Sequence, residues 1–209
     1  MNKIIFSLAM LLSFTAMAQS DNYSDEMQKA IVALDTSYTF TELQSVANIF
    51  ERIADEEKTQ WLPYYYAGLA YANIGWDVIN IDKDDNAEKI LALCSKAELL
   101  EKNAEIYSLR YMAATQQTMV DPVARWATYG MEAKAILEKG LDLDPDNPRL
   151  HYLEAMSVLS TPEQFGGGKE KARPMLEKAV ELLKAEHAKP LYPNWGLSAA
   201  QGALAGINW

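Results

Sequence analysis

Cysteine and histidine are scarce in this chain of 209 residues, which has one cysteine and two histidines. A single cysteine, Cys94, cannot form an internal disulfide, so the fold must be held by packing alone. Cys94 stands among leucines, with no base or cluster of positive charge next to it in the sequence. We therefore expect a small buried side chain with an unreactive thiol.

Catalytic motifs are missing from the sequence as well. His151 and His187 are far apart and belong to no H-E-x-x-H or H-x-x-E-H motif, and there is no G-x-S-x-G nucleophile elbow. No predicted helix pair combines a nucleophile, a base and an orienting group. We therefore predict a non-enzymatic protein with no catalytic residue, no metal site and no cofactor.

Positive charge is limited. The 19 lysines and arginines stand against 29 aspartates and glutamates, which gives a formal net charge of −10 at pH 7. An acidic surface repels phosphate groups, so we expect neither nucleic acid nor an anionic membrane as a partner. Hydrophobic residues make up 49% of the chain, which is enough for one compact domain with a buried core.

A long hydrophobic run occurs only at the start, MNKIIFSLAMLLSFTAMAQS. Lys3, the apolar run after it and the small-x-small site at 16–18 are typical of a secretory signal peptide, which we assign to 1–18. The run is shorter than the roughly 20 residues that span a bilayer, and Gln19 stands where a lipoprotein has its cysteine. We therefore predict an exported protein, periplasmic or secreted, with no stable membrane insertion once the signal peptide is removed.

Strand patterns are absent from the sequence, and apolar residues recur instead at helical spacing between glycines and prolines. In ELQSVANIFERIAD, from Glu42, the apolar residues form one stripe, and Thr41 is the expected N-cap. The sequence predicts an all-α chain with helices over 24–34, 42–55, 61–76, 85–101, 104–118, 122–140, 148–160, 168–187 and 195–206.

Three of these helices begin alike, with WLPYYYAGLAY at Trp61, AEIYSLRYMAA at Ala104 and PRLHYLEAMSV at Pro148. They align without gaps, and their starts are 43 and 44 residues apart. Each is followed by a second helix with small and large apolar residues at spacings of four and three. A small residue lets two helices approach closely, and a large one fills the space beside it. The sequence therefore predicts repeated helix pairs.

The chain resembles the tetratricopeptide repeat (TPR) family, most clearly in AKAILEKGLDLDPDNPRLHYLEAMSVL over 133–159 and KARPMLEKAVELL over 171–183. The resemblance implies antiparallel helix pairs stacked as a short right-handed superhelix, with about four pairs and a C-terminal capping helix within 19–209. The spacings exceed the usual TPR period of about 34 residues, which indicates a divergent array with long links. The signal peptide, the WLPYYYAG helix, the GGG turn and the terminal YPNWG are also similar to exported repeat proteins of bacterial envelopes.

The stretch LDLDPDNP suits either a calcium loop or a turn. From Asp142, oxygen ligands occupy the first three alternate positions of a calcium loop, but Asn147 replaces the glycine and Leu153 replaces the closing glutamate. As a turn, Pro145 ends one helix, and Asp146 or Asn147 caps the next. We interpret the stretch as a turn.

Two other stretches have similarly plain interpretations. IDKDDNAEK, over 81–89, also lacks the glycine and the glutamate of a calcium loop, so we expect a loop in which Asp84 or Asp85 caps the following helix. FGGGKEKA, over 165–172, lacks the preceding strand and the final Ser or Thr of a nucleotide-binding P-loop. We interpret it as a link between paired helices.

The resemblance also implies a binding face, because the first helix of each TPR pair lines a concave groove. At the groove positions of that family this sequence has residues that make adaptable contacts. We predict that they bind an extended peptide or a helix of a protein partner. The alternative is that the long links fill the groove and these residues belong to the core. The residues are Tyr65, Asn73, Met112, Thr115, Gln116, Arg149, Tyr152 and Met156.

A small-molecule site is the alternative to a protein partner. Aromatic side chains are dense over 61–76, and an aromatic pocket there would suit a small ligand. The pocket would be lined by Tyr64, Tyr65, Tyr66, Tyr71, Trp76 and Arg110. As the main function we predict a module that binds a protein or peptide, and as the alternative an accessory protein that binds a small molecule.

Overall fold

A computed structural model of the chain describes residues 22–77 and 80–207. Every regular element in these two ranges is helical, which confirms the predicted all-α class. The predicted signal peptide, 1–18, lies outside the described residues. The elements are residues 22–35, α2 (Phe40–Glu57), α3 (Trp61–Asp77), α4 (Lys83–Leu100), α5 (Ala104–Val120), α6 (Pro122–Arg125), η1 (Trp126–Gly130), α7 (Met131–Leu143), α8 (Pro148–Ser160), η2 (Glu163–Phe165), α9 (Lys169–Ala185) and α10 (Leu197–Ile207).

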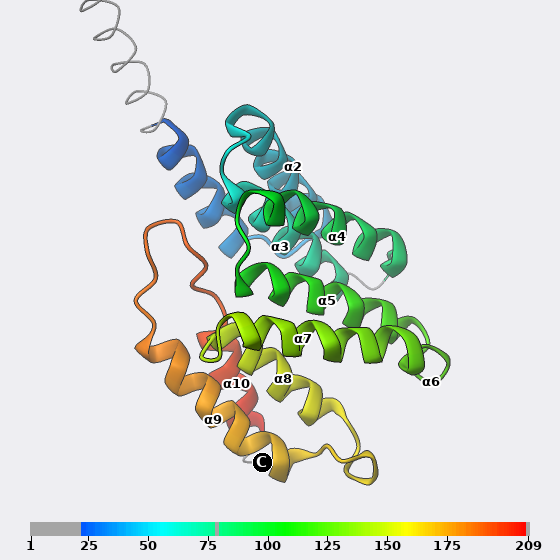
Figure 1. The fold of residues 1–209 in the computed structure, drawn as a ribbon. Coiled ribbons are helices and arrows are strands. Elements are labelled where there is room, and N and C mark those ends of the chain that lie inside the picture. The colour runs from blue at the N-terminus through cyan, green and yellow to red at the C-terminus, as the bar shows by residue number, and fades with distance from the viewer. Residues whose placement is uncertain (1–21, 78–79, 208–209) are drawn as a thin grey trace, which may run out of the picture.

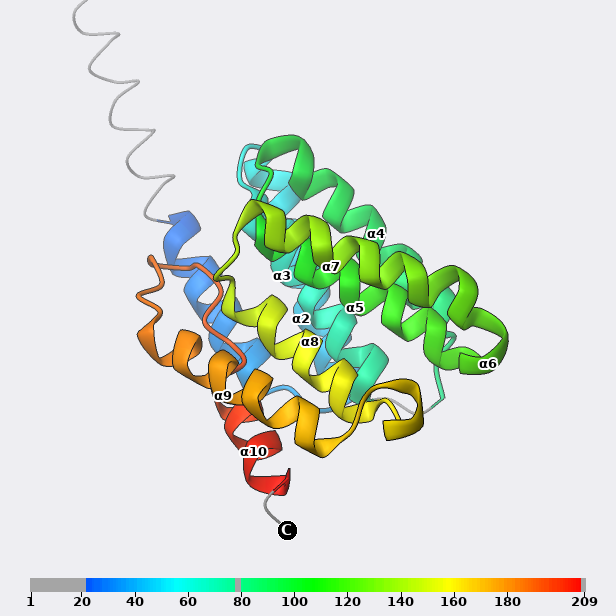
Figure 2. The same cartoon turned by 60° about the horizontal axis from the view of Figure 1, so that its bottom comes forward.

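Helices that follow one another in the sequence pack against each other. Contacts join α2 to α3, α3 to α4, α4 to α5 and α5 to α7, and then α8 to α9 and α9 to α10. Figure 1 shows the helices from α3 to α9 as successive layers, and Figure 2 shows α10 beside α9 at the end of the stack. α5 lies at the centre, because it also contacts α3 and α8, which begin other predicted pairs.

The first residues of α2 and α4 are set by caps that precede the predicted ones. Thr39, and not Thr41, caps α2, because the glutamate three residues after Thr39 completes a reciprocal capping box. Asp82, and not Asp84 or Asp85, caps α4 by accepting hydrogen bonds from the N–H groups of both later aspartates. Both helices therefore begin about two residues earlier than predicted.

The stretch LDLDPDNP forms the predicted turn. α7 ends at Leu143, and Pro148 occupies the first position of α8. The side-chain oxygen of Asn147 caps α8 by accepting a hydrogen bond from the Leu150 N–H at 3.0 Å. The Asn147 amide also donates to Glu105 at 2.6 Å, so the turn is tied to the start of α5.

The helix predicted over 122–140 corresponds to a helical segment that begins at Pro122, ends at Leu143 and has three parts. α6 and α7 are separated by η1, a π-helical turn, which is a rare form.

The glycine-rich run forms the predicted link between α8 and α9. Gly166 and Gly168 adopt φ angles of 86° and 101° there, a left-handed region that suits glycine.

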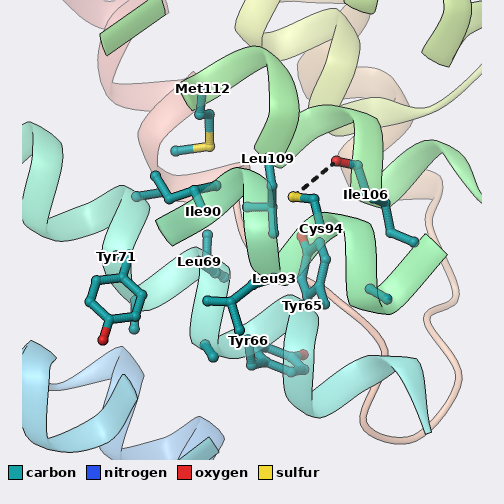
Figure 3. Close-up of a cluster of buried hydrophobic side chains, with 14 of the residues drawn as sticks. Tyr65, Tyr66, Leu69, Tyr71, Ile90, Leu93, Cys94, Ile106, Leu109 and Met112 are labelled. Atoms are coloured by element: carbon teal, nitrogen blue, oxygen red, sulfur yellow. Dashed lines mark hydrogen bonds between the residues drawn. The ribbon is translucent and has the colours of Figure 1, made fainter. Parts of the chain in front are cut away.

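The main core is one cluster of buried side chains to which the helix over 22–35, α2, α3, α4 and α5 contribute most. Figure 3 shows its centre, where Ile90 and Cys94 of α4 lie among Leu109 and Met112 of α5. The Cys94 sulfur lies 3.8 Å from the Ile106 carbonyl oxygen. Burial raises the pKa of the Cys94 thiol to about 12, which confirms the buried side chain expected from the sequence.

Within 22–77 and 80–207, each helix is too short or too polar to cross a bilayer. α2, for example, carries an exposed face and a buried face, with Leu43 and Phe50 on the buried side. Such amphipathic helices bury their apolar stripe against other helices.

Close helix packing at Gly140 of α7 can be tested by adding one methyl group. A Cβ atom there would lie 2.6 Å from Cδ1 of Leu150 and 2.9 Å from Cβ of Tyr107. We predict that Gly140→Ala lowers the free energy of unfolding by about 1–3 kcal/mol through overpacking, measured by urea denaturation. Gly202→Ala in α10 is the control, because nothing lies within 4 Å of that position. A loss of stability of the same size in the control would contradict the close approach.

Burial of Cys94 predicts a thiol that reacts only when the protein unfolds. The thiolate is the nucleophile, and with a pKa of about 12 little thiolate is present at mildly alkaline pH. We expect iodoacetamide to leave the native chain unmodified and to label it along the urea unfolding transition, measured by mass spectrometry. Rapid labelling of the native chain would show that this thiol is exposed.

Candidate functional site

Two cavities lie near α3, one towards each of its ends. The larger has a volume of about 390 Å³ and is lined by Trp61, the first residue of α3. The smaller has a volume of about 300 Å³ and is lined by Tyr71 and Ile74. Both volumes fall at the low end of the roughly 300–1,000 Å³ typical of small-molecule sites. The larger cavity combines aromatic, cationic and imidazole side chains, and we take it as the candidate site.

This larger cavity, the link cavity, is bounded by three connections between helices. Its walls come from the turn between α4 and α5, from the turn before α8 and from the irregular 186–196 link between α9 and α10. Two aromatic rings, two exposed lysines and one exposed histidine share these walls with buried ionic groups. The residues that line the link cavity include Trp61, Lys102, Glu105, Arg149, Glu186, His187, Lys189 and Tyr192.

The 186–196 link is held over α3 mainly by side chains. The Tyr66 hydroxyl donates to the Leu191 carbonyl at 3.0 Å. The indole N–H of Trp195 donates to the Tyr65 hydroxyl oxygen at 2.8 Å. Both ends and the middle of the link are therefore in contact with helices that begin predicted TPR pairs, and the link can be followed in Figure 2 between α9 and α10.

Aromatic rings run from the core into the link cavity. Phe50 of α2 stacks on Tyr66 with ring centroids 5.2 Å apart. Tyr65 meets Tyr66 edge-on at 5.4 Å, and Trp61 meets Tyr65 edge-on at 5.5 Å. Tyr192 of the link then meets Trp61 edge-on at 5.6 Å. Edge-to-face contacts at these separations are favourable beyond the area they bury, so the link extends an aromatic cluster of the core.

A buried ion pair lies beneath the cavity. Arg149 Nε lies 2.5 Å from a carboxylate oxygen of Glu105, and the two side chains are 3% and 11% exposed. The Arg149 guanidinium also donates to both carboxylate oxygens of Glu186 and to the Trp195 carbonyl at 3.5 Å. One arginine thus joins α5, α8 and both ends of the 186–196 link.

The ionisation of this cluster is fixed by its surroundings. The Tyr65 hydroxyl donates to Glu105 at 3.3 Å, and burial, followed by the charge of Glu105, raises the pKa of Tyr65 well above its usual value. Burial by itself lowers the pKa of Arg149, but its contacts with Glu186 and Glu105 more than offset this and leave that pKa raised. Tyr65 therefore stays protonated and Arg149 stays charged at neutral pH. Arg149 keeps its ion pairs with Glu105 and Glu186 under these conditions.

The eight predicted groove residues do not form one exposed strip. The buried ones, with exposed fractions of 0%, 5%, 0% and 2%, are Tyr65, Met112, Gln116 and Arg149. The half-buried ones are Asn73, Thr115, Tyr152 and Met156. Of the eight, Arg149 lines the link cavity, and none lines the smaller cavity.

The buried groove residues have partners inside the protein. Gln116 donates to the Ala72 carbonyl and accepts from the Asn86 amide, so it joins α3, α4 and α5. Tyr65 and Arg149 are joined through Glu105 and lie under the 186–196 link. These three side chains are therefore packed inside the protein.

The aromatic pocket predicted on 61–76 also differs from the structure. The rings of Tyr65, Tyr66 and Tyr71 are buried in the core, and Figure 3 shows them beside its leucines. The remaining members are separated: Tyr64 bonds to the Ala54 carbonyl, Arg110 pairs with Glu98, and Trp76 is exposed near the other end of α3. These six side chains do not line one pocket.

Sequence reasoning missed most of the link cavity. Lys102, His187, Lys189 and Tyr192 lie in connections between helices, whereas the TPR resemblance directs attention to helix faces. Residues up to 187 were predicted to be helical, but α9 ends at Ala185. The aromatic residues of YPNWG were the available signal, because aromatic side chains in a link need an apolar surface to contact.

The acidic stretches add no site to this description. Among the described residues, no group of three or more His, Cys, Asp or Glu side chains is arranged to hold a metal ion. Asp82, which begins one of these stretches, caps α4, and the Asp84 carboxylate pairs with Arg125 at 2.6 Å. These carboxylates therefore have structural partners in the chain.

The Arg149–Glu105 pair can be tested by removing its cation. We predict that Arg149→Ala lowers the free energy of unfolding by about 3–5 kcal/mol, because Glu105 and Glu186 are left without their partner. Arg52→Ala is the control, since Arg52 pairs with Glu26 and Glu56 on the surface and should cost less than about 1 kcal/mol. Urea denaturation measures both, and equal losses would contradict the special position of Arg149.

Comparisons with known proteins give one informative match. No family model and no curated protein matches the chain. Among solved structures, the HusA haemophore from Porphyromonas gingivalis superimposes with a TM-score of 0.77 and 35% sequence identity. The match covers 88% of this chain and 92% of the other.

This match corrects the predicted function and partner. We predicted a module that binds a protein or peptide, and that prediction is wrong, because the matching protein is named for carrying haem, which is a small molecule. The same finding corrects the partner, which we predicted to be a protein. Since the similarity extends over nearly the whole of both chains, with 35% identity, the chain belongs to the family of the HusA haemophore.

Proposed function

We propose that this protein binds a flat tetrapyrrole of the haem class and carries it without chemical change. The observation that supports the proposal is the 35% identity to a haemophore over 88% of this chain. Our alternative prediction, an accessory protein that binds a small molecule, agrees with this proposal in the kind of partner but named no particular ligand. The sequence motifs of a nucleophile or metalloenzyme are missing, so we propose a non-enzymatic carrier.

The link cavity has the chemistry that such a ligand requires. A tetrapyrrole presents a wide aromatic face, which favours contact with the rings of Trp61 and Tyr192. Haem also carries propionate carboxylates at one edge, and two exposed lysines, Lys102 and Lys189, stand on the cavity wall. Arg149 is already neutralised by two carboxylates, so the lysines are the cations open to a ligand.

Two side chains at the cavity belong to types that hold haem iron in other proteins. These are the imidazole of His187 and the phenol of Tyr192. Binding of haemin and of the same porphyrin without iron, measured in parallel, separates iron coordination from ring stacking. Equal affinities would assign the binding energy to the ring and its carboxylates.

The remaining proposals concern location and repeat type. The predicted signal peptide, 1–18, supports export to the periplasm or outside the cell, where a carrier meets ligands that the cytoplasm does not supply. The sequence patterns at 133–159 and 171–183 support a divergent TPR-like superhelix over 19–209. In this proposal the helix pairs form the scaffold, and the links form the binding site.

Titration of residues 19–209 with haemin tests the function directly. We expect a saturable shift of the Soret absorbance and a rise in melting temperature, since a ligand that binds only the native state stabilises it. The double variant Lys102→Gln and Lys189→Gln should bind haemin about five- to tenfold more weakly, because two charged contacts to the carboxylates are lost.

A matched pair of lysines on α9 provides the control. Lys178 and Lys184 are exposed and lie away from the cavity wall, so Lys178→Gln with Lys184→Gln removes the same charge without touching the proposed site. We expect haemin affinity to stay unchanged in this variant. Equal weakening by both double variants would contradict the site, and absence of saturable binding by the unaltered chain would contradict the function.

A further inference from the structure

We propose that the 186–196 link covers a hidden binding surface and that a flat aromatic ligand binds by displacing it. This surface, the aromatic platform, is the part of α3 that the link contacts, namely the ring of Trp61 and the hydroxyl groups of Tyr65 and Tyr66. The ligand class, a tetrapyrrole, rests on the proposed function. The displacement itself rests on the contacts of the link.

The link's own aromatic side chains occupy the space that a ligand ring would take. Tyr192 lies edge-on to Trp61 with centroids 5.6 Å apart. Trp195 reaches the hydroxyl of Tyr65 through its indole N–H at 2.8 Å. Removal of Tyr192 would free the edge of the Trp61 ring, and removal of Trp195 would free the Tyr65 hydroxyl. A flat ligand can replace such contacts, because every aromatic face offers the same kind of surface.

Arg149 holds both ends of the link, through Glu186 and the Trp195 carbonyl. Between those ends, few backbone interactions hold the link closed. Its residues have no helical or extended structure, and the backbone hydrogen bond that forms within it joins the Tyr192 N–H to the Lys189 carbonyl. Leu191 has a φ of 66°, in the left-handed region that is unfavourable for a residue with a side chain. Residues 187–190 are exposed. Segments with these properties open locally far below the free energy of global unfolding.

Opening the link would enlarge a cavity that is already present. The link cavity is bounded by Trp61 on one side and by His187, Lys189 and Tyr192 of the link on the other. Outward movement of the link would widen this volume beside Trp61 and towards the hydroxyl groups of Tyr65 and Tyr66. The closed cavity, at about 390 Å³, is therefore one part of the site, and the platform is the other.

Two neighbouring tyrosines of α3 allow a matched test. Tyr66→Phe removes the hydroxyl that donates to Leu191 of the link and keeps the aromatic ring. Tyr64→Phe makes the same change where the hydroxyl bonds to the Ala54 carbonyl, away from the link. Loss of the anchor raises the population of the open, binding-competent state. We therefore expect Tyr66→Phe to bind haemin about fivefold more tightly and Tyr64→Phe to bind it as the unaltered chain does.

Hydrogen exchange provides the second measurement. If the ligand displaces the link, the amides of 187–196 exchange faster with haemin bound than without it. Slower exchange of these amides, together with unchanged or weaker binding by Tyr66→Phe, would overturn the displacement and leave haemin binding by the protein intact. Failure of the unaltered chain to bind haemin or iron-free porphyrin would instead overturn the proposed function on which the ligand class rests.

Discussion

The buried pair between Arg149 and Glu105 is the interaction on which the arrangement of the site depends. A charge removed from water is tolerated only when its partners satisfy it. Arg149 is satisfied by two carboxylates and by the Trp195 carbonyl, which come from α5 and from both ends of the 186–196 link. Glu105 is satisfied by Arg149, Tyr65 and Asn147. One desolvated cluster therefore fixes where α5, α8 and the link lie relative to α3.

This constraint separates the scaffold from the candidate site. The stacked helices bury their apolar faces and fix the ends of α3, α5 and α8, while the connections between helices supply the exposed lysines, the histidine and the tyrosine of the link cavity. Rigid helices that position variable links are a common arrangement for binding sites. In the proposed function the chain also has to release its ligand, and the middle of the link, which Tyr66 holds through one hydrogen bond to Leu191, can move more easily than a helix can.

The comparison with the HusA haemophore changes which features of the sequence matter for function. Viewed as a TPR-like array, the chain directed attention to Tyr65, Gln116 and Arg149 as groove residues for a protein partner. Those side chains are buried and hydrogen-bonded inside the protein. In the proposed function, Arg149 lines the link cavity and Tyr65 lies edge-on to Trp61 of its wall, whereas Gln116 joins α3, α4 and α5 away from it.

The sequence by itself determined the helical class, the approximate bounds of the helices, the LDLDPDNP turn and the burial of Cys94, because helical periodicity and capping are local properties. It placed caps such as Thr41 and Asp84 a few residues late, since neighbouring residues of the same type compete for one position. Only the tertiary structure decided that Glu105 meets Arg149 across 44 residues and that the 186–196 link lies over α3. Such contacts depend on how distant helices stack, and no local pattern of spacing or propensity encodes that distance.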